Sequence, residues 1–475
     1  MAAEDAAADA LGDLKDLKLL DLDLIALSGE SLGCVTVTAA VMGRELVQEA
    51  RVRLGNPRGI VRLLHGTQTL SESTPMGKQV TAGARIQCLV VAISVEQERN
   101  VVHAVLRGVV PGEDGWQVWE CVESLAEVED LSSIALPSGL RSLAFSSRFN
   151  QSLENANFPS GLTRIVFGDA FNQPLENVVF PESLKSIEFG RDFNQRLAAR
   201  VPLPRGLQHA VSFLFKQGIT PVTFPEGLKS ITFGDAFNQS LVGAQFPDNL
   251  QSITFGRDFN QSLVNVQFPT GLQTLAFGRD FIRSLVNVQF PSGLQNLALG
   301  IRFNLSLVNV QFPSGLRSIT FSVYFNMSLE DVVFPDGLLH LTFGDFFNQS
   351  LEHTVLPDSL QSITFGRYFD QSMRRVALPS GLKSLTFGDF FSQSMEDVAL
   401  PAGLESLTFG YRFNYSLARV ALPDGLQSLA FGYSYNRSFK HVRPPAGLRQ
   451  IRLARGSSLS LAGMKLPPNV EVLRE

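Results

Sequence analysis

The sequence is poor in cysteine and has no large excess of either charge. Three cysteines among 475 residues, none of them in a Cys-x-x-Cys pair, argue against a disulfide framework and against a zinc site. The 40 basic and 45 acidic residues give a formal charge of −5, so charge offers no argument for binding nucleic acid or an anionic membrane. No apolar run reaches the length of a membrane span. Residues 1–20 are acidic, lack the features of a signal peptide and are expected to be disordered, so we expect a cytoplasmic protein.

The sequence also lacks any group of residues that points to catalysis. Its six histidines are scattered, and none has a cysteine or an acidic residue at the spacing of a metal site or a catalytic triad. No phosphate-binding or dinucleotide-binding glycine loop is present. We therefore expect a protein that is not an enzyme and that binds no cofactor and no metal.

Phenylalanine is abundant, with 37 residues against six tyrosines and two tryptophans, and it recurs with a fixed period. The pattern Phe-Gly-x-x-Phe-Asn-Gln-Ser-Leu begins at Phe233, Phe255 and Phe343, and prolines from Pro225 to Pro467 follow one another at steps of 22 residues. A strict period of this length is typical of a solenoid, in which each repeat forms one coil, here called a rung. The sequence predicts a mainly β solenoid of about fifteen rungs over residues 135–475, roughly 70 Å long.

Within one rung, the pattern predicts a short strand followed by a tight turn. Ile253 and Phe255 alternate toward the interior, and Gly256 ends the strand where the backbone must turn. The asparagine that follows the second phenylalanine is expected to hydrogen-bond turn backbone, so that asparagines stack from rung to rung. The Asn-x-Ser sequons are then a by-product of the repeat rather than glycan sites. The stretch from Leu203 to Phe224 keeps the length but loses the glycine and the asparagine, which predicts an irregular rung with a local bulge.

These residues resemble the FNIP-type leucine-rich repeat, whose signature is a Phe-Asn pair followed by an apolar-Pro step. The resemblance covers residues 135–475 and implies a protein-interaction scaffold, in some members attached to signalling or ubiquitin-pathway domains. The asparagine lies later in the rung than it does in a plain leucine-rich repeat.

The rungs differ most at the second residue after the strand-ending glycine. It is small or charged in the first half of the array and aromatic on four consecutive rungs, and further tyrosines follow on later rungs. The aromatic residues are Tyr324, Phe346, Tyr368 and Phe390, with Tyr411 and Tyr433 beyond them. Because aromatic residues dominate protein interfaces, we interpret these six residues as a surface that binds a protein partner. The alternative is a stack of rings that only ties adjacent rungs together.

Two other positions vary in a regular way. The residue directly after the glycine is charged in many rungs, and opposite signs such as Asp235 and Arg257 are expected to pair across neighbouring rungs. Outward strand positions carry small hydroxyl residues such as Ser252 and Thr254, which suit a crowded concave sheet. A regular hydroxyl lattice could instead bind ice or a glycan, and the chain would then be a structural or ordered-surface solenoid with its first domain acting only as a cap.

Residues 21–94 do not share the period. Their predicted order is two strands, a helix and two strands, and Arg62, Leu63, Leu64 and Leu70 have the spacing found in ubiquitin-like domains. The resemblance implies an α+β (β-grasp) domain, with the apolar recognition patch of ubiquitin mapped onto Leu27, Leu64 and Leu89. It implies docking on ubiquitin-pathway receptors. The alternative is that these leucines are ordinary strand residues or cover the repeats.

Residues 95–134 are expected to be a linker and an N-terminal cap. Trp116, Val118 and Cys121 fall one period before the first clear strand, which predicts a degenerate capping rung. The sequence as a whole thus favours a non-catalytic adaptor, in which the repeats hold one protein and the first domain docks on another.

Overall fold

The computed structural model describes residues 19–26, 31–38, 43–54, 60–65, 68–70, 79, 85–91, 95–106, 113–132, 134–197, 222–455, 461 and 465–474. These residues belong to two compact units. The first comprises residues 1–143 and 159–162, and the second comprises residues 144–158 and 163–475.

The first unit contains a mixed five-stranded sheet with strand order β2-β1-β5-β3-β4. Strand β1 pairs antiparallel with β2 and parallel with β5, and β3 pairs antiparallel with both β5 and β4. Helix α2 contacts β3 and buries Leu46, Val47 and Ala50. The elements are β1 (Leu19–Ala26), β2 (Ser31–Thr38), α2 (Gly43–Arg53), β3 (Ile60–His65), β4 (Gln68–Thr69) and β5 (Arg85–Val91).

Two more helices and a strand complete the described part of the first unit, namely α3 (Val95–Leu106), α4 (Glu113–Glu120) and β6 (Ser124–Val128). The prediction of a capping rung at Trp116 to Cys121 is wrong, because most of this stretch is helix α4. Trp116 and Trp119 are three residues apart and both are buried, as one helix face requires. The Trp119 Nε1–H donates a hydrogen bond to the Ala135 backbone oxygen at 2.9 Å.

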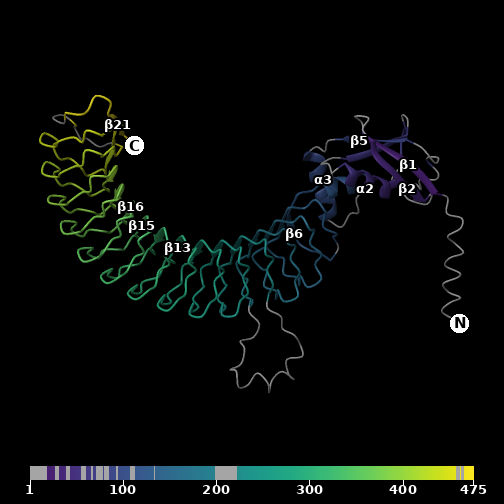
Figure 1. Ribbon diagram of the computed structural model, residues 1–475, viewed down its shortest axis with the longest axis horizontal. Helices are drawn as coiled ribbons and strands as arrows, with labels where there is room; N and C mark the ends of the chain where they lie inside the picture. The colour runs from purple at the N-terminus through teal and green to yellow at the C-terminus, as the bar shows by residue number, and fades with distance from the viewer. Residues whose placement is uncertain are drawn as a thin grey trace, which may run out of the picture. The chain divides into compact units, whose positions relative to one another are not determined.

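The remaining strands form the solenoid, and the prediction of a leucine-rich-repeat-like array of parallel rungs is confirmed. Strands β6 to β21 form one 16-stranded sheet in sequence order, and every neighbouring pair from β8 to β21 is parallel. Within the second unit the strands lie on the inner side of a curved solenoid (Figure 1). The bounds are β7 (Ser142–Phe145), β8 (Arg164–Val166), β9 (Ser186–Glu188), β10 (Ser230–Thr232), β11 (Ser252–Thr254), β12 (Thr274–Ala276), β13 (Asn296–Ala298), β14 (Ser318–Thr320), β15 (His340–Thr342), β16 (Ser362–Thr364), β17 (Ser384–Thr386), β18 (Ser406–Thr408), β19 (Ser428–Phe431), β20 (Gln450–Leu453) and β21 (Glu471–Arg474).

One joint departs from the 22-residue register. Strand β9 pairs directly with β10, with Ile187 opposite Ile231, so no strand of the intervening sequence lies between them. The prediction that residues from Leu203 to Phe224 form a rung of the stack is therefore wrong. Residues 198–221, which hold most of it, lie outside the described residues.

Stacked phenylalanine rings fill the interior of the rungs. Phe255 and Phe259 lie 3.9 Å apart between ring centroids within one rung, and Phe259 lies 6.1 Å from Phe281 in the next. Both positions are at most a few per cent exposed along the array. The single apolar residue in the middle of each strand, such as Ile253, is fully buried between two half-exposed neighbours. This alternation is the one predicted from the sequence.

The glycine after each strand serves close packing between rungs. A Cβ on Gly256 would lie 2.1 Å from the backbone oxygen of Gly234, and Gly256 is not among the glycines with positive φ. The chain does turn after Gly256 as predicted, and the distance to Gly234 shows that glycine is needed there for steric reasons. Ser322 occupies this position in one rung, and its hydroxyl donates a hydrogen bond to the Phe303 backbone oxygen. In the rung before it, the smaller Leu299 replaces the phenylalanine that directly precedes the glycine.

Candidate protein-binding surface

The backbone places the second residue after each glycine in a straight column. Its N–H donates a hydrogen bond to the carbonyl oxygen of the first residue after the glycine in the preceding rung. These bonds measure 2.9 Å from Phe346 to Val323, 2.8 Å from Tyr368 to Asp345 and 2.9 Å from Phe390 to Arg367. Because the same bond recurs at each joint, side chains at this position are held one above another at the spacing of the rungs.

The four predicted aromatic residues of this column do come together. Tyr324 stacks on Phe346 with ring centroids 5.0 Å apart, and Phe346 stacks on Tyr368 at 4.9 Å. Phe390 follows at 4.8 Å from Tyr368, tilted by 41°. Tyr324 and Phe346 are 49% and 42% exposed, and the other two are half-buried. We call Tyr324, Phe346, Tyr368 and Phe390 the aromatic strip, a row of apolar rings along the turns of four consecutive rungs.

Arginine continues the column beyond the last ring. The guanidinium carbon of Arg412 lies 4.0 Å from the ring centroid of Phe390, within the range of a cation–π contact. No acidic side chain pairs with Arg412 in the described part of the chain, whereas Arg302, which precedes Tyr324 in the column, pairs with Asp280 at 3.3 Å. Sequence reasoning missed Arg412, although its position in the 22-residue register marks it as the next member of the column.

Tyr411 and Tyr433 form a separate stack. They are the first residues after their glycines, one position before the column of the aromatic strip, and their ring centroids lie 5.6 Å apart at an angle of 8°. Both are about half exposed, at 51% and 53%. The six residues predicted as one surface thus fall into two stacks, and Arg412 lies on the same turn as Tyr411.

Charged residues occupy the first position after the glycine in other rungs, and the predicted pairing across rungs occurs. Arg257 Nη1 lies 4.0 Å from Asp235 Oδ2, and Arg367 Nε lies 3.7 Å from Asp389 Oδ2. The shorter contact of Arg257 is with its own neighbour, since Nε donates to Asp258 Oδ1 at 2.8 Å. This hydrogen bond is the main reason that the pKa of Arg257 is raised, and the negative charge of Asp258 is the second reason. Arg257 therefore stays charged at every relevant pH.

The asparagines predicted to bond turn backbone form a ladder on the other side of the aromatic strip. Asn326 N–H donates to Asn304 Oδ1 at 2.9 Å, and Asn348 N–H donates to Asn326 Oδ1 at 2.8 Å. The same bond continues through Asp370 to Ser392, also at 2.8 Å. These oxygens are therefore used to hold rungs together, which confirms the structural interpretation of the repeated Phe-Asn pair.

The concave face carries the predicted hydroxyl rows, with Ser252 in register between Ser230 and Thr274. Ion pairs interrupt these rows, among them Arg164 with Glu188 at 2.6 Å and Lys383 with Glu405 at 3.7 Å. A face that is both curved and charged does not present the flat, uniform lattice that an ordered surface requires.

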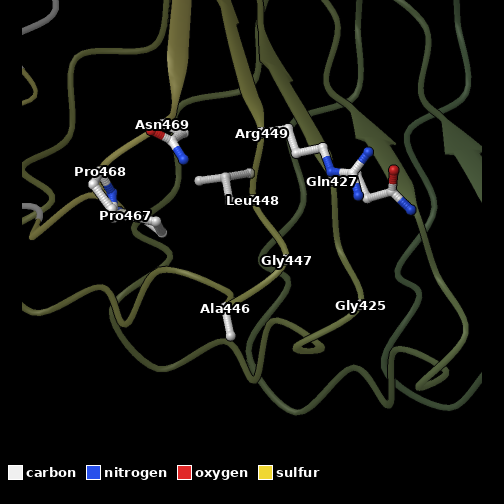
Figure 2. Close-up of a pocket in the computed structure, with 9 residues that line it drawn as sticks. All are labelled: Gly425, Gln427, Ala446, Gly447, Leu448, Arg449, Pro467, Pro468 and Asn469. Carbon is white, nitrogen blue, oxygen red and sulfur yellow. The ribbon is translucent and has the colours of Figure 1, made fainter.

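An open hollow of about 630 Å³ lies beside the last rungs, lined by glycines and prolines together with Gln427, Leu448 and Arg449 (Figure 2). Within the ranges that the structure describes, no three metal-binding side chains cluster, and no helix is long and apolar enough to cross a membrane. Cys121 is buried.

The repeat sequences match a family model described as FNIP Repeat in seven segments. The matched residues are 131–170, 171–209, 215–258, 259–301, 303–346, 347–390 and 391–441. The chain belongs to the FNIP repeat family. The FNIP repeats here are stacked rungs, and at most joints asparagines hydrogen-bond and phenylalanines stack between neighbouring rungs.

One solved structure supports this fold. The FNIP chain is similar to CroV588, described as a novel circular LRR protein, with 31% identity and a TM-score of 0.60 over 74% of this chain. The chain spans about half of CroV588, 53% of its length. It also matches an internalin, InlF of Listeria monocytogenes, with 13% identity and a TM-score of 0.36 over 79% of this chain and 94% of that one. No curated protein matches the sequence.

The proposed ubiquitin-like patch is only partly within the described residues. Leu27 lies outside them. Leu64 is in strand β3 opposite Gln87, and Leu89 is in β5 opposite Arg62, so the pairing of β3 with β5 places both on neighbouring strands. The backbone is described at these two positions, and the patch itself stays a prediction.

Proposed function

We propose that this FNIP repeat protein is a non-catalytic, cytoplasmic adaptor. Its solenoid binds a protein partner through the aromatic strip and the nearby Tyr411–Tyr433 stack, and its N-terminal unit is a ubiquitin-like domain that docks on ubiquitin-pathway receptors. The observation that carries the proposal is the row of exposed aromatic rings, because large apolar side chains gathered on a surface mark interaction sites.

The FNIP repeat and the leucine-rich-repeat-like fold support a binding role, since such solenoids present long surfaces on which side chains vary while the frame stays constant. The mixed five-stranded sheet, with helix α2 in contact with β3, supports the ubiquitin-like part of the proposal. On this reading, Leu64 and Leu89 would dock together with Leu27.

A quantitative pull-down from cell extract with full-length baits tests both parts. The first bait is the unchanged chain, and the second replaces Tyr324, Phe346, Tyr368 and Phe390 with serine. The third carries Leu64→Glu and Leu89→Glu. The control carries Val333→Ser and Val355→Ser, which remove apolar side chains that are 78% and 80% exposed away from the strip. Thermal unfolding of each bait shows whether it remains folded.

We expect one set of proteins to be lost only from the second bait and another only from the third. If all four folded baits recover the same proteins, the adaptor proposal fails. Loss with the control bait as well would mean that the aromatic strip has no special role.

A further inference from the structure

The rings of the aromatic strip are evenly spaced. Successive centroids lie 5.0, 4.9 and 4.8 Å apart from Tyr324 to Phe390, so the strip offers four apolar contacts over about 15 Å. The backbone bonds between rungs fix this spacing, and a partner must match it to place one apolar group against each ring.

Three kinds of peptide segment have different spacings. In an amphipathic α-helix, apolar residues at i, i+3, i+7 and i+10 lie at roughly 0, 4.5, 10.5 and 15 Å along the axis, within about 1 Å of each ring. Side chains on one face of an extended strand repeat at about 6.8 Å and lose register after one ring. A polyproline II helix repeats at about 9.3 Å and meets every second ring. Of the three, the α-helix alone places one residue on every ring.

The charges at the two ends of the strip differ. Arg302 before the strip is paired with Asp280, whereas Arg412 after the strip touches Phe390 and has no acidic partner among the described side chains. A helix ends with partial negative charge at its C-terminus, so this end is favoured beside Arg412. An acidic residue about one turn beyond the last apolar residue would add a charge-assisted hydrogen bond.

The borders of the strip suit such a helix. On one side, the exposed Asp345, Arg367 and Asp389 lie beside Phe346, Tyr368 and Phe390, and the half-buried Val323 lies beside Tyr324. On the other side lie the polar side chains of the asparagine ladder. Polar residues on both flanks of an apolar row match the polar flanks of an amphipathic helix, as in the rim of a protein interface.

We propose that the strip binds an amphipathic helix of a partner protein, with apolar residues at i, i+3, i+7 and i+10 and an acidic residue near i+14 beside Arg412. This inference rests on the proposed function, in that it takes the aromatic strip to be the binding surface.

Selection from a display library of random 18-residue peptides on the immobilised full-length protein tests it. Enriched peptides are then measured for binding to the unchanged chain, to a Phe346→Ser, Phe390→Ser variant, and to the Val333→Ser, Val355→Ser control. We expect the affinity of the enriched peptides to fall at least about tenfold for the Phe346→Ser, Phe390→Ser variant and to stay unchanged for the control. The enriched peptides should carry apolar residues at i, i+3, i+7 and i+10 and an acidic residue near their C-terminal end.

The outcomes separate the inference from the proposed function. Strip-dependent peptides with alternating apolar residues or with proline repeats would overturn the helix and leave the strip as a binding surface. A dimer of the chain that is lost in the Phe346→Ser, Phe390→Ser variant would have the same consequence. Absence of any strip-dependent peptide, with both variants folded, would overturn both and leave the rings as a stack that ties rungs together.

Arg412→Glu tests the polarity separately. Arg412 is exposed, so the variant is expected to fold, and it should weaken binding of the acid-ended peptides at least about tenfold while favouring peptides that end in lysine or arginine. Unchanged affinity and unchanged selection would overturn the assignment of the acidic end to Arg412.

Discussion

Replacing Gly256 with alanine should destabilise the solenoid by about 3 kcal/mol or more, which is the upper range for overpacking. A Cβ at this position would lie 2.1 Å from the Gly234 oxygen and 2.3 Å from its carbonyl carbon. Close carbon–oxygen contacts in proteins are about 3.3 Å, so the two rungs would have to separate locally by about 1 Å. The Asp258 N–H to Asp235 O hydrogen bond, now 2.8 Å, would then exceed bonding distance.

The matched control is Gly403→Ala, at the corner of a later rung. The nearest atom to a Cβ there is the Ser380 oxygen at 3.5 Å, an ordinary contact. This change should leave the free energy of unfolding unchanged or raise it by about 0.4–1 kcal/mol, because alanine restricts the unfolded chain.

Guanidinium unfolding followed by circular dichroism measures both variants. Hydrogen exchange at rungs near Gly256 shows whether the loss is local, since solenoids do not always unfold in one step. A Gly256→Ala protein within about 1 kcal/mol of the unchanged chain, with Gly403→Ala equally stable, would refute the steric explanation of the glycine column.

Three further changes test the packing and bonding of the rungs by the same unfolding assay. Phe281→Ala removes a fully buried ring and should cost about 3–5 kcal/mol, and a loss under 1 kcal/mol would contradict the role of the ring stacks. Ile282→Asn should restore the missing acceptor for the Asn304 N–H and add about 0.5–1 kcal/mol; no gain would mean that the ladder bonds contribute little. Tyr435→Phe removes a buried hydroxyl that has no hydrogen bond of good geometry and should add about 1 kcal/mol at pH 7. Burial raises the pKa of Tyr435 from 10.0 to about 12, so the folded state holds this proton more tightly and the unchanged chain should lose stability relative to the variant as pH rises from 10 to 12; parallel curves would contradict the shift.

The sequence allowed the rung to be predicted because, in a solenoid, the local pattern is also the global one. Each rung contacts only its neighbours, so the alternation around Ile253 and the period of the prolines already specify strand, core face and register. The aromatic strip could be predicted for the same reason, since residues 22 positions apart must lie side by side.

What escaped prediction depends on contacts that are not periodic. The spacing of Trp116 and Trp119 fits a helix, but the 22-residue frame had assigned Trp116, Val118 and Cys121 to a degenerate capping rung. Arg412 was overlooked because a single charged residue among aromatic ones has no pattern of its own, and its meaning comes from lying 4.0 Å above Phe390. The role of Gly256 required the distance to the neighbouring backbone, which composition and spacing do not give.

The joint between β9 and β10 explains why counting periods gives one rung too many. Across this joint the Asn238 N–H donates to Asn194 Oδ1 at 3.0 Å, and Phe193 lies 6.1 Å from Phe237, values also found at ordinary joints such as Asn238 to Asn260. An ordinary joint uses glycine for close approach and asparagine as an acceptor, and the stretch from Leu203 has Ser212 and Lys216 at those positions. Because each rung bonds only to its neighbours, β9 and β10 pair in register although this stretch separates them in the sequence. Ser322 and Ile282 each replace one of these residues within the stack, so one such substitution does not exclude a rung, and length alone does not determine the number of rungs.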